Sequence, residues 1–140
     1  MNIAVRYYSR LGNTKKVAGA IADAAGVRAE ECNVPLNGDV EVLFLGGAVY
    51  GGGIDKPLRD FIESITPENV KNVALFATSA IARKPDKEME KALLEKNIKI
   101  AERRFHCRGS FTILHRGRPN AEDLKQASDF AASIIKQNNG

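Results

Sequence analysis

Two short runs in this sequence contain only apolar side chains, and each is followed by a loop and then by a helical pattern. Residues 42–45 read Val-Leu-Phe-Leu and residues 73–77 read Val-Ala-Leu-Phe-Ala. Such runs have no polar side to turn toward water, which is typical of strands that are covered on both faces of a parallel sheet. Parallel strands need long crossover connections, usually helices, so the sequence predicts an α/β fold.

The strand–loop–helix unit can be followed along the chain. We expect strands over residues 3–8, 27–33, 40–49, 73–77 and 98–113, and helices over residues 14–25, 55–65, 85–97 and from 120 onward. Gly26 is suited to end the first helix, Asp55 to cap the second, and Asn120 with Asp123 to cap the last. The expected inward-facing residues of the last three helices are Leu58, Phe61, Ile62 and Ile65; Met89, Leu93 and Leu94; and Leu124, Ala127, Ala131, Ile134 and Ile135.

The hydrophobic pattern also predicts the strand order. The first, third and fourth strands are apolar enough for burial on both faces, whereas the second and fifth alternate as edge strands do. The expected fold is therefore a three-layer αβα domain with a five-stranded parallel sheet in the order 2-1-3-4-5. In that order a crevice opens beyond the carboxyl ends of the first and third strands, where ligands bind.

A chain of 140 residues has the length of one domain, so we expect residues 1–140 to form a single unit. The longest apolar stretch, residues 42–50, is too short for a membrane span of about 20 residues, and residues 1–3 start no leader. We therefore expect a cytoplasmic protein with no membrane contact. Two distant cysteines and two histidines do not make a zinc site, and we expect both thiols to be reduced.

Positive charge is concentrated in the second half of the sequence. The net charge is +4, and Glu102 is the one acidic residue between Lys96 and Arg118, a stretch that contains seven basic residues. Such a stretch could bind nucleic acid, but no aromatic-interleaved RNA motif or recognition helix accompanies it. We interpret it as a solvated edge or a docking patch for an acidic protein.

The loop over residues 9–14 has the chemistry of a phosphate-binding site. It follows the first strand, starts the first helix, and reads Ser-Arg-Leu-Gly-Asn-Thr, with hydroxyls at both ends and a glycine inside. Amide groups at a helix N-terminus, the positive end of the helix dipole and hydroxyl donors together bind phosphate. The loop is neither GxGxxG nor GxxxxGK[ST], which disfavours dinucleotide binding and nucleotide hydrolysis.

Together with three further segments, this loop resembles the flavodoxin family. Tyr8 and the loop after it resemble the loop that binds the phosphate of FMN, residues 47–53 and 78–80 resemble the second and third flavin loops, and residues 105–109 with 119–124 resemble the end of short-chain flavodoxins. The resemblance implies FMN as cofactor. It implies that the phosphate is held by Ser9, Arg10, Gly12, Asn13 and Thr14, with Leu11 in the same cofactor-binding loop. One side of the isoalloxazine would be bordered by Ala48, Val49, Tyr50, Gly51, Gly52 and Gly53. The other side would be lined by Thr78, Ser79, Ala80, Ile81 and Ala82.

Three features depart from the family pattern. Leu11 stands where a hydroxyl is usual, the third loop has no aromatic residue to stack on the flavin, and the protein is basic where flavodoxins are commonly acidic. Tyr50 is then the candidate stacking platform.

The resemblance implies an electron carrier that shuttles single electrons between redox enzymes and has no catalytic residue of its own. Its partners would be a reductase and an electron acceptor that dock near the flavin loops, and we expect a monomer. The alternatives are an FMN-dependent quinone or nitro-compound reductase, or a flavoprotein activator of manganese ribonucleotide reductase. A third alternative is a flavin-free or nucleic-acid-associated binding module.

Overall fold

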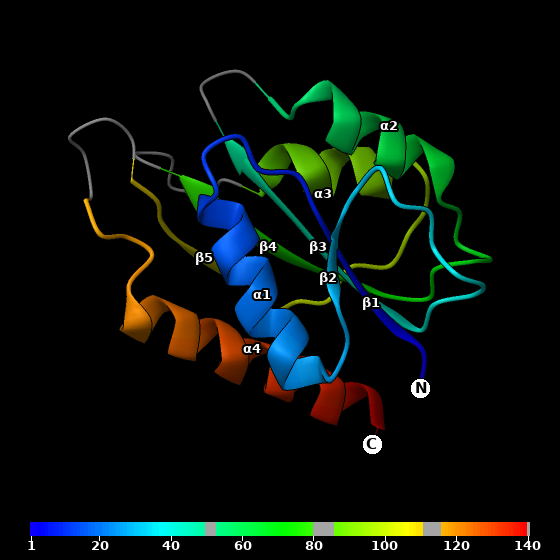
Figure 1. Cartoon of the computed structure of the whole chain (residues 1–140). Coiled ribbons are helices and arrows are strands. Elements are labelled where there is room, and N and C mark those ends of the chain that lie inside the picture. The colour runs from blue at the N-terminus through cyan, green and yellow to red at the C-terminus, as the bar shows by residue number, and fades with distance from the viewer. Residues whose placement is uncertain (50–52, 80–85, 111–115, 140) are drawn as a thin grey trace.

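The strands of the protein form one parallel sheet in the order β2-β1-β3-β4-β5, as the sequence predicts (Figure 1). The computed structural model describes residues 1–49, 53–79, 86–110 and 116–139. The strands are β1 (Ile3–Tyr7), β2 (Ala29–Glu31), β3 (Val42–Val49), β4 (Val73–Ser79) and β5 (Phe105–Arg108). The helices are α1 (Asn13–Ala25), α2 (Lys56–Ser64), α3 (Lys87–Leu94) and α4 (Ala121–Asn139).

Helices cover both faces of the sheet, with α1 and α4 on one face and α2 and α3 on the other (Figure 1). Successive side chains of β3 point to opposite faces, so Phe44 packs in the α1–α4 core and Leu43 and Leu45 in the α2–α3 core. This arrangement explains the unbroken apolar run, because a strand in the middle of the sheet meets no solvent on either side. None of the helices in the described ranges is both long and apolar enough to cross a membrane.

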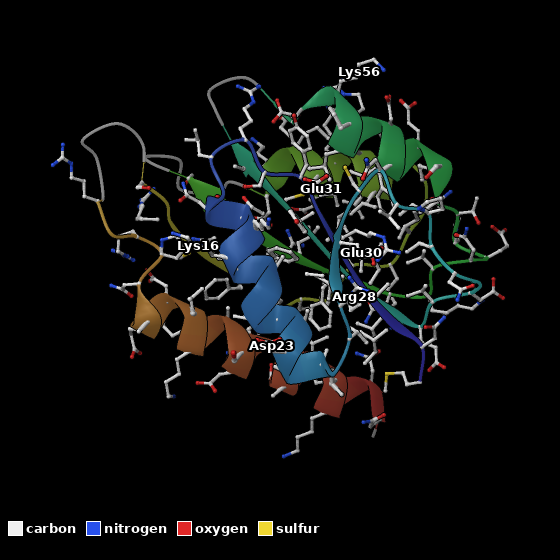
Figure 2. The ribbon with its side chains drawn as sticks, in the orientation of Figure 1. Lys16, Asp23, Arg28, Glu30, Glu31 and Lys56 are labelled. Carbon is white, nitrogen blue, oxygen red and sulfur yellow. The ribbon has the colours of Figure 1, made fainter. Side chains whose placement is uncertain are left out.

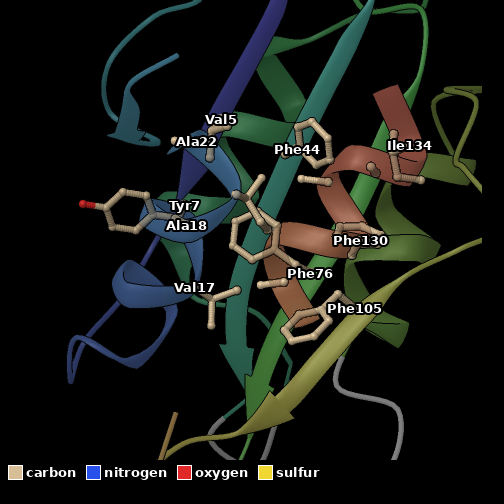
Figure 3. Packing of buried hydrophobic residues seen from close by; sticks show 14 of the residues in the cluster. Val5, Tyr7, Val17, Ala18, Ala22, Phe44, Phe76, Phe105, Phe130 and Ile134 are labelled. Atoms are coloured by element: carbon tan, nitrogen blue, oxygen red, sulfur yellow. The ribbon is translucent and has the colours of Figure 1, made fainter. Parts of the chain in front are cut away.

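Phenylalanine rings fill the core between the sheet and α4 (Figure 3). Phe130 of α4 lies with its ring centroid 5.9 Å from that of Phe44, edge to face, and 6.0 Å from that of Phe105. Phe130 is 1% exposed. It is absent from the inward-facing residues predicted for this helix, although Ala127, Ala131 and Ile134 are confirmed as buried.

Two predictions for the second half of the chain are wrong. Leu94 is 55% exposed, because α3 ends there and only Met89 and Leu93, four residues apart, share the face that packs on the sheet. The last strand is also shorter than predicted: among the described residues, 105–108 form the continuous ladder with β4, and Ile100 adds one isolated bridge to Val73 of that strand. Residues 111–113 of that predicted strand lie outside the described residues.

A reciprocal capping box begins α4, as the sequence predicts. The Asp123 amide donates to Asn120 Oδ1 at 2.9 Å, and the Asn120 amide donates to Asp123 Oδ2 at 2.8 Å. Arg118 adds a two-pronged ion pair, donating from Nη2 to Asp123 Oδ1 at 2.8 Å and from Nε to Oδ2. The Arg118 hydrogen bonds lower the pKa of Asp123.

We expect Asp123→Asn to lower the free energy of unfolding at pH 7 by about 1 to 3 kcal/mol, the contribution of hydrogen bonds to a charged group. Because the pKa of Asp123 is lower in the folded state, its stabilisation is present above the unfolded pKa of about 4 and is lost as the pH falls through the folded value. Urea unfolding at pH 7 and near pH 2.5 should show the difference from wild type shrinking in acid. Asp129→Asn, which breaks an exposed ion pair with Lys125 on the same helix, is the control.

Candidate functional site

The predicted site residues gather at the end of the sheet where the strands finish. The turn after β1, the end of β3 and the start of α2 lie together at this end (Figure 1). β2 pairs with one edge of β1 and β3 pairs with the opposite edge, so the direction of strand order reverses between β1 and β3. This reversal opens the crevice in which ligands of such sheets bind.

The turn after β1 is held by its own serine. The Gly12 amide donates to Ser9 Oγ at 2.9 Å, and Gly12 has a φ of 88°, a left-handed conformation that glycine adopts without strain. Gly12 precedes α1 directly, and its carbonyl accepts the first helical hydrogen bond, from the Lys16 amide at 3.2 Å. The amides of Asn13, Thr14 and Lys15 therefore point out of the helix end without helical partners.

The N-terminus of α1 fits an anion. Its first turn contains no acidic residue and its cap position makes no side-chain hydrogen bond, which is also true of α2, whereas the first turns of α3 and α4 contain two acidic residues each. A Cβ placed on Gly12 would meet no atom within 4 Å, so the space beside the turn is open. Amide donors, the helix dipole and this open space suit a phosphate group.

The side chains of Asn13 and Thr14 tie this turn to the neighbouring strands. Asn13 Nδ2 donates to the Ser110 carbonyl at 2.9 Å, and the hydroxyls of Thr14 and Thr78 lie 2.9 Å apart with Thr14 fully buried. Gly109 lies so close to Asn13 that an added Cβ would be 2.7 Å from Asn13 Nδ2. Asn13 and Thr14, both predicted to hold phosphate, thus link α1 to the ends of the sheet strands. Asn13 reaches the segment after β5, and Thr14 reaches β4.

Arg10 forms an ion pair with Asp55, a contact that the sequence did not predict. Arg10 Nε donates to Asp55 Oδ2 at 3.2 Å, and Nη2 donates to Oδ1. Asp55 is the N-cap residue of α2, as the sequence predicts, but its side chain makes no cap hydrogen bond and binds Arg10 instead. The guanidinium offers the carboxylate two hydrogen bonds and a full charge, more than one backbone amide provides. Leu11, the next residue, is 53% exposed.

The second and third loops are described in part. Ala48 is half-buried near the end of β3, and Gly53 has a φ of 103°. Thr78 and Ser79 are buried at the end of β4, and Arg108 Nη1 donates to Ser79 Oγ at 3.2 Å. The backbone of Val49 pairs with Ser79. The remaining predicted flavin contacts, Tyr50, Gly51, Gly52, Ala80, Ile81 and Ala82, lie outside the described residues.

Gly47 has a packing role that the sequence motif does not reveal. It lies inside β3, and a Cβ on it would come within 2.6 Å of the Leu58 side chain. Leu58 is 1% exposed on the inner face of α2. The absence of a side chain at Gly47 thus allows α2 to pack directly on β3.

A cavity of about 690 Å³ lies beside α2, away from the predicted site residues. One wall is the segment after β2, where a loop stands in place of a crossover helix, and the other includes Phe61 and Ile65. Buried Arg6 braces that segment by donating from Nε to the Val34 carbonyl and from Nη2 to the Pro35 carbonyl, both at 2.9 Å. Burial lowers the pKa of Arg6.

Much of the basic stretch from Lys96 to Arg118 is engaged within the molecule. Arg104 pairs with Asp86 and Glu90, and these hydrogen bonds raise its pKa. Arg103 donates to Ser133 Oγ, and Arg118 pairs with Asp123. These contacts join β5 and its flanking segments to α3 and α4.

Both cysteines are free thiols, Cys32 buried and Cys107 half-buried on β5 with its neighbour His106 exposed. Burial, reinforced by the Asp123 charge, raises the pKa of Cys107 to about 12. Since the thiolate is the reactive form, we expect iodoacetamide at pH 8 to alkylate Cys107 about 10³-fold more slowly than an unperturbed thiol. Mass spectrometry of folded and urea-unfolded protein checks this. Equally fast labelling in both states would contradict it.

Comparison with known proteins agrees with the fold. Residues 4–112 match the family described as the flavodoxin domain. An uncharacterised protein of Methanocaldococcus jannaschii is 27% identical over 138 residues, 89% of this chain and 91% of its own. Two solved structures share the fold at 16% identity: a flavodoxin from the domain Archaea (TM-score 0.82, 100% of both chains) and a short-chain flavodoxin associated with a non-canonical PDU bacterial microcompartment (TM-score 0.73, 99% of both chains). The chain belongs to the flavodoxin family.

Proposed function

We propose that this protein binds FMN and carries single electrons between redox enzymes. The observation that carries the proposal is the start of α1. Its first amides have no helical partners, it lies at the reversal of strand order, and its first turn contains no acidic residue. A phosphate group matches that combination of donors, dipole and position.

Each loop has a proposed role around the cofactor. The amides of residues 13–15 bind the phosphate, and Ser9 keeps the turn in the conformation that exposes them. Ala48 to Gly53 border one side of the isoalloxazine, and Thr78 to Ala82 line the other. The bound flavin supplies the redox chemistry, while the protein holds and shields it.

The same loop favours FMN over FAD or riboflavin. The turn between Ser9 and Thr14 closes around one terminal phosphate, and the sequence has no GxGxxG groove for a pyrophosphate. Riboflavin has no phosphate, so it loses the interactions at the helix end. The proposed partners are a reductase and an electron acceptor that approach the flavin loops.

The visible absorption spectrum of the purified full chain tests the proposal. A flavin spectrum, or its appearance after addition of FMN, is the expected result. A colourless protein that cannot be reconstituted with FMN would instead favour a flavin-free binding module. Oxidation of NAD(P)H by the purified protein with a quinone or nitro compound would favour the reductase alternative.

A further inference from the structure

The ion pair between Arg10 and Asp55 connects two loops that are far apart in the sequence. The residues are 45 positions apart, and the guanidinium contacts both carboxylate oxygens. Arg10 lies within the turn before α1, and Asp55 lies two residues after Gly53. The pair therefore joins two of the three loops that the proposed function places around FMN: the one at the phosphate and the one at the first side of the isoalloxazine.

Burial and charge indicate that the contact restrains both loops. The Asp55 side chain is 16% exposed and the Arg10 side chain 52%, so the carboxylate is held near the protein surface while the guanidinium reaches across to it. Asp55 also lies at the positive end of the α2 dipole, where its charge is favoured. The Arg10 charge is thus compensated by a carboxylate.

We propose that Arg10 and Asp55 form a clamp that slows the release of flavin, and that Asp55 is a positioning residue acting through Arg10. This proposal rests on the proposed function. Flavin leaves when the two loops separate, and separating them breaks a two-pronged ion pair. Loss of either partner should speed release about two- to fivefold, the range that an exposed or partly exposed ion pair supports.

The clamp differs in its consequences from direct binding of phosphate by Arg10. If Arg10 bound the phosphate, the Asp55 carboxylate would compete with the phosphate for the Arg10 guanidinium. Removing the Asp55 charge would then tighten FMN binding. The benefit of Arg10 would also vanish for riboflavin, which has no phosphate. A clamp between loops instead slows the release of both FMN and riboflavin. Removing either Arg10 or Asp55 would therefore speed the release of both flavins.

The test measures flavin release from the full chain loaded with FMN or riboflavin, followed by the fluorescence of the freed flavin. We expect Arg10→Gln and Asp55→Asn each to speed release of both flavins about two- to fivefold. The double variant should release flavin no faster than the faster single variant, because the two residues act as one unit. Arg10→Lys keeps the charge without the two-pronged geometry and should fall between wild type and Arg10→Gln.

Lys56→Gln is the matched control. Lys56 follows Asp55 directly, and its exposed side chain (Figure 2) pairs with Asp60 of the same helix at 2.7 Å and not with the turn after β1, so its loss should leave release unchanged. Unchanged release in Asp55→Asn, slower release of FMN in that variant, or an effect of Arg10→Gln on FMN alone would each overturn the clamp. A wild-type chain that binds no flavin would overturn the proposed function and the clamp with it, so the two failures are distinguishable.

Discussion

Phe130→Ala should lower the free energy of unfolding by about 3 to 5 kcal/mol, the cost of removing a large ring from a packed core. Phe130 is 1% exposed and contacts Phe44 and Phe105 from the middle of α4 (Figure 3). Its removal would leave a cavity between the helix and the sheet, and the rigid sheet beneath cannot collapse to fill it. Denaturant unfolding measures the loss, which also corresponds to a fall of roughly 10 °C or more in Tm.

Leu94→Ala is the matched control for this prediction. Leu94 is also a large apolar residue in a helix of the second half, but 55% of it is exposed. We expect its truncation to change stability by about 0.5 kcal/mol or less, since little packing is lost and alanine is a good helix former. Comparable losses in the two variants would contradict the packing described for α3 and α4.

Thr14→Val should weaken FMN binding about 10- to 100-fold and riboflavin binding much less. The Thr14 hydroxyl has one hydrogen and two lone pairs, so it can accept from Thr78 and still donate to a phosphate oxygen at the end of α1. A hydrogen bond to a charged group contributes about 1.5 to 3 kcal/mol, which corresponds to the stated change in Kd. Fluorescence titration with both flavins gives the comparison.

The control for Thr14→Val is Thr78→Val. This variant removes the same hydrogen bond between the two hydroxyls but keeps the Thr14 hydroxyl itself. We expect Thr78→Val to keep the ratio of the FMN and riboflavin Kd values close to that of wild type. If the two variants weaken both flavins equally, Thr14 serves to join α1 to β4 and does not bind phosphate.

The site was partly predictable from the sequence because its backbone is organised locally. Ser9 and Gly12 lie three residues apart in one turn, close enough for the Gly12 amide to donate to the Ser9 hydroxyl. The positive φ of Gly12 is a conformation that glycine adopts readily. The partners of Arg10, Asn13 and Thr14 are 45, 97 and 64 residues away, and no local pattern points to them. Asp55 in particular has the sequence position of a helix cap, and its pairing with Arg10 instead depends on where the turn after β1 lies.

By itself, the sequence determined the order of the elements, the strand order and the glycine turn before α1, because these depend on periodicity, glycine positions and burial patterns within short segments. The runs at residues 42–45 and 73–77 could only be stable inside a sheet, and the capping box at Asn120 is complete within four residues. Tertiary structure alone decided that Phe130 completes the core, that Leu94 is exposed and that Asp55 binds Arg10. These outcomes depend on distances between segments that approach only after the sheet and helices have packed, and side-chain type and spacing along the chain do not encode those distances.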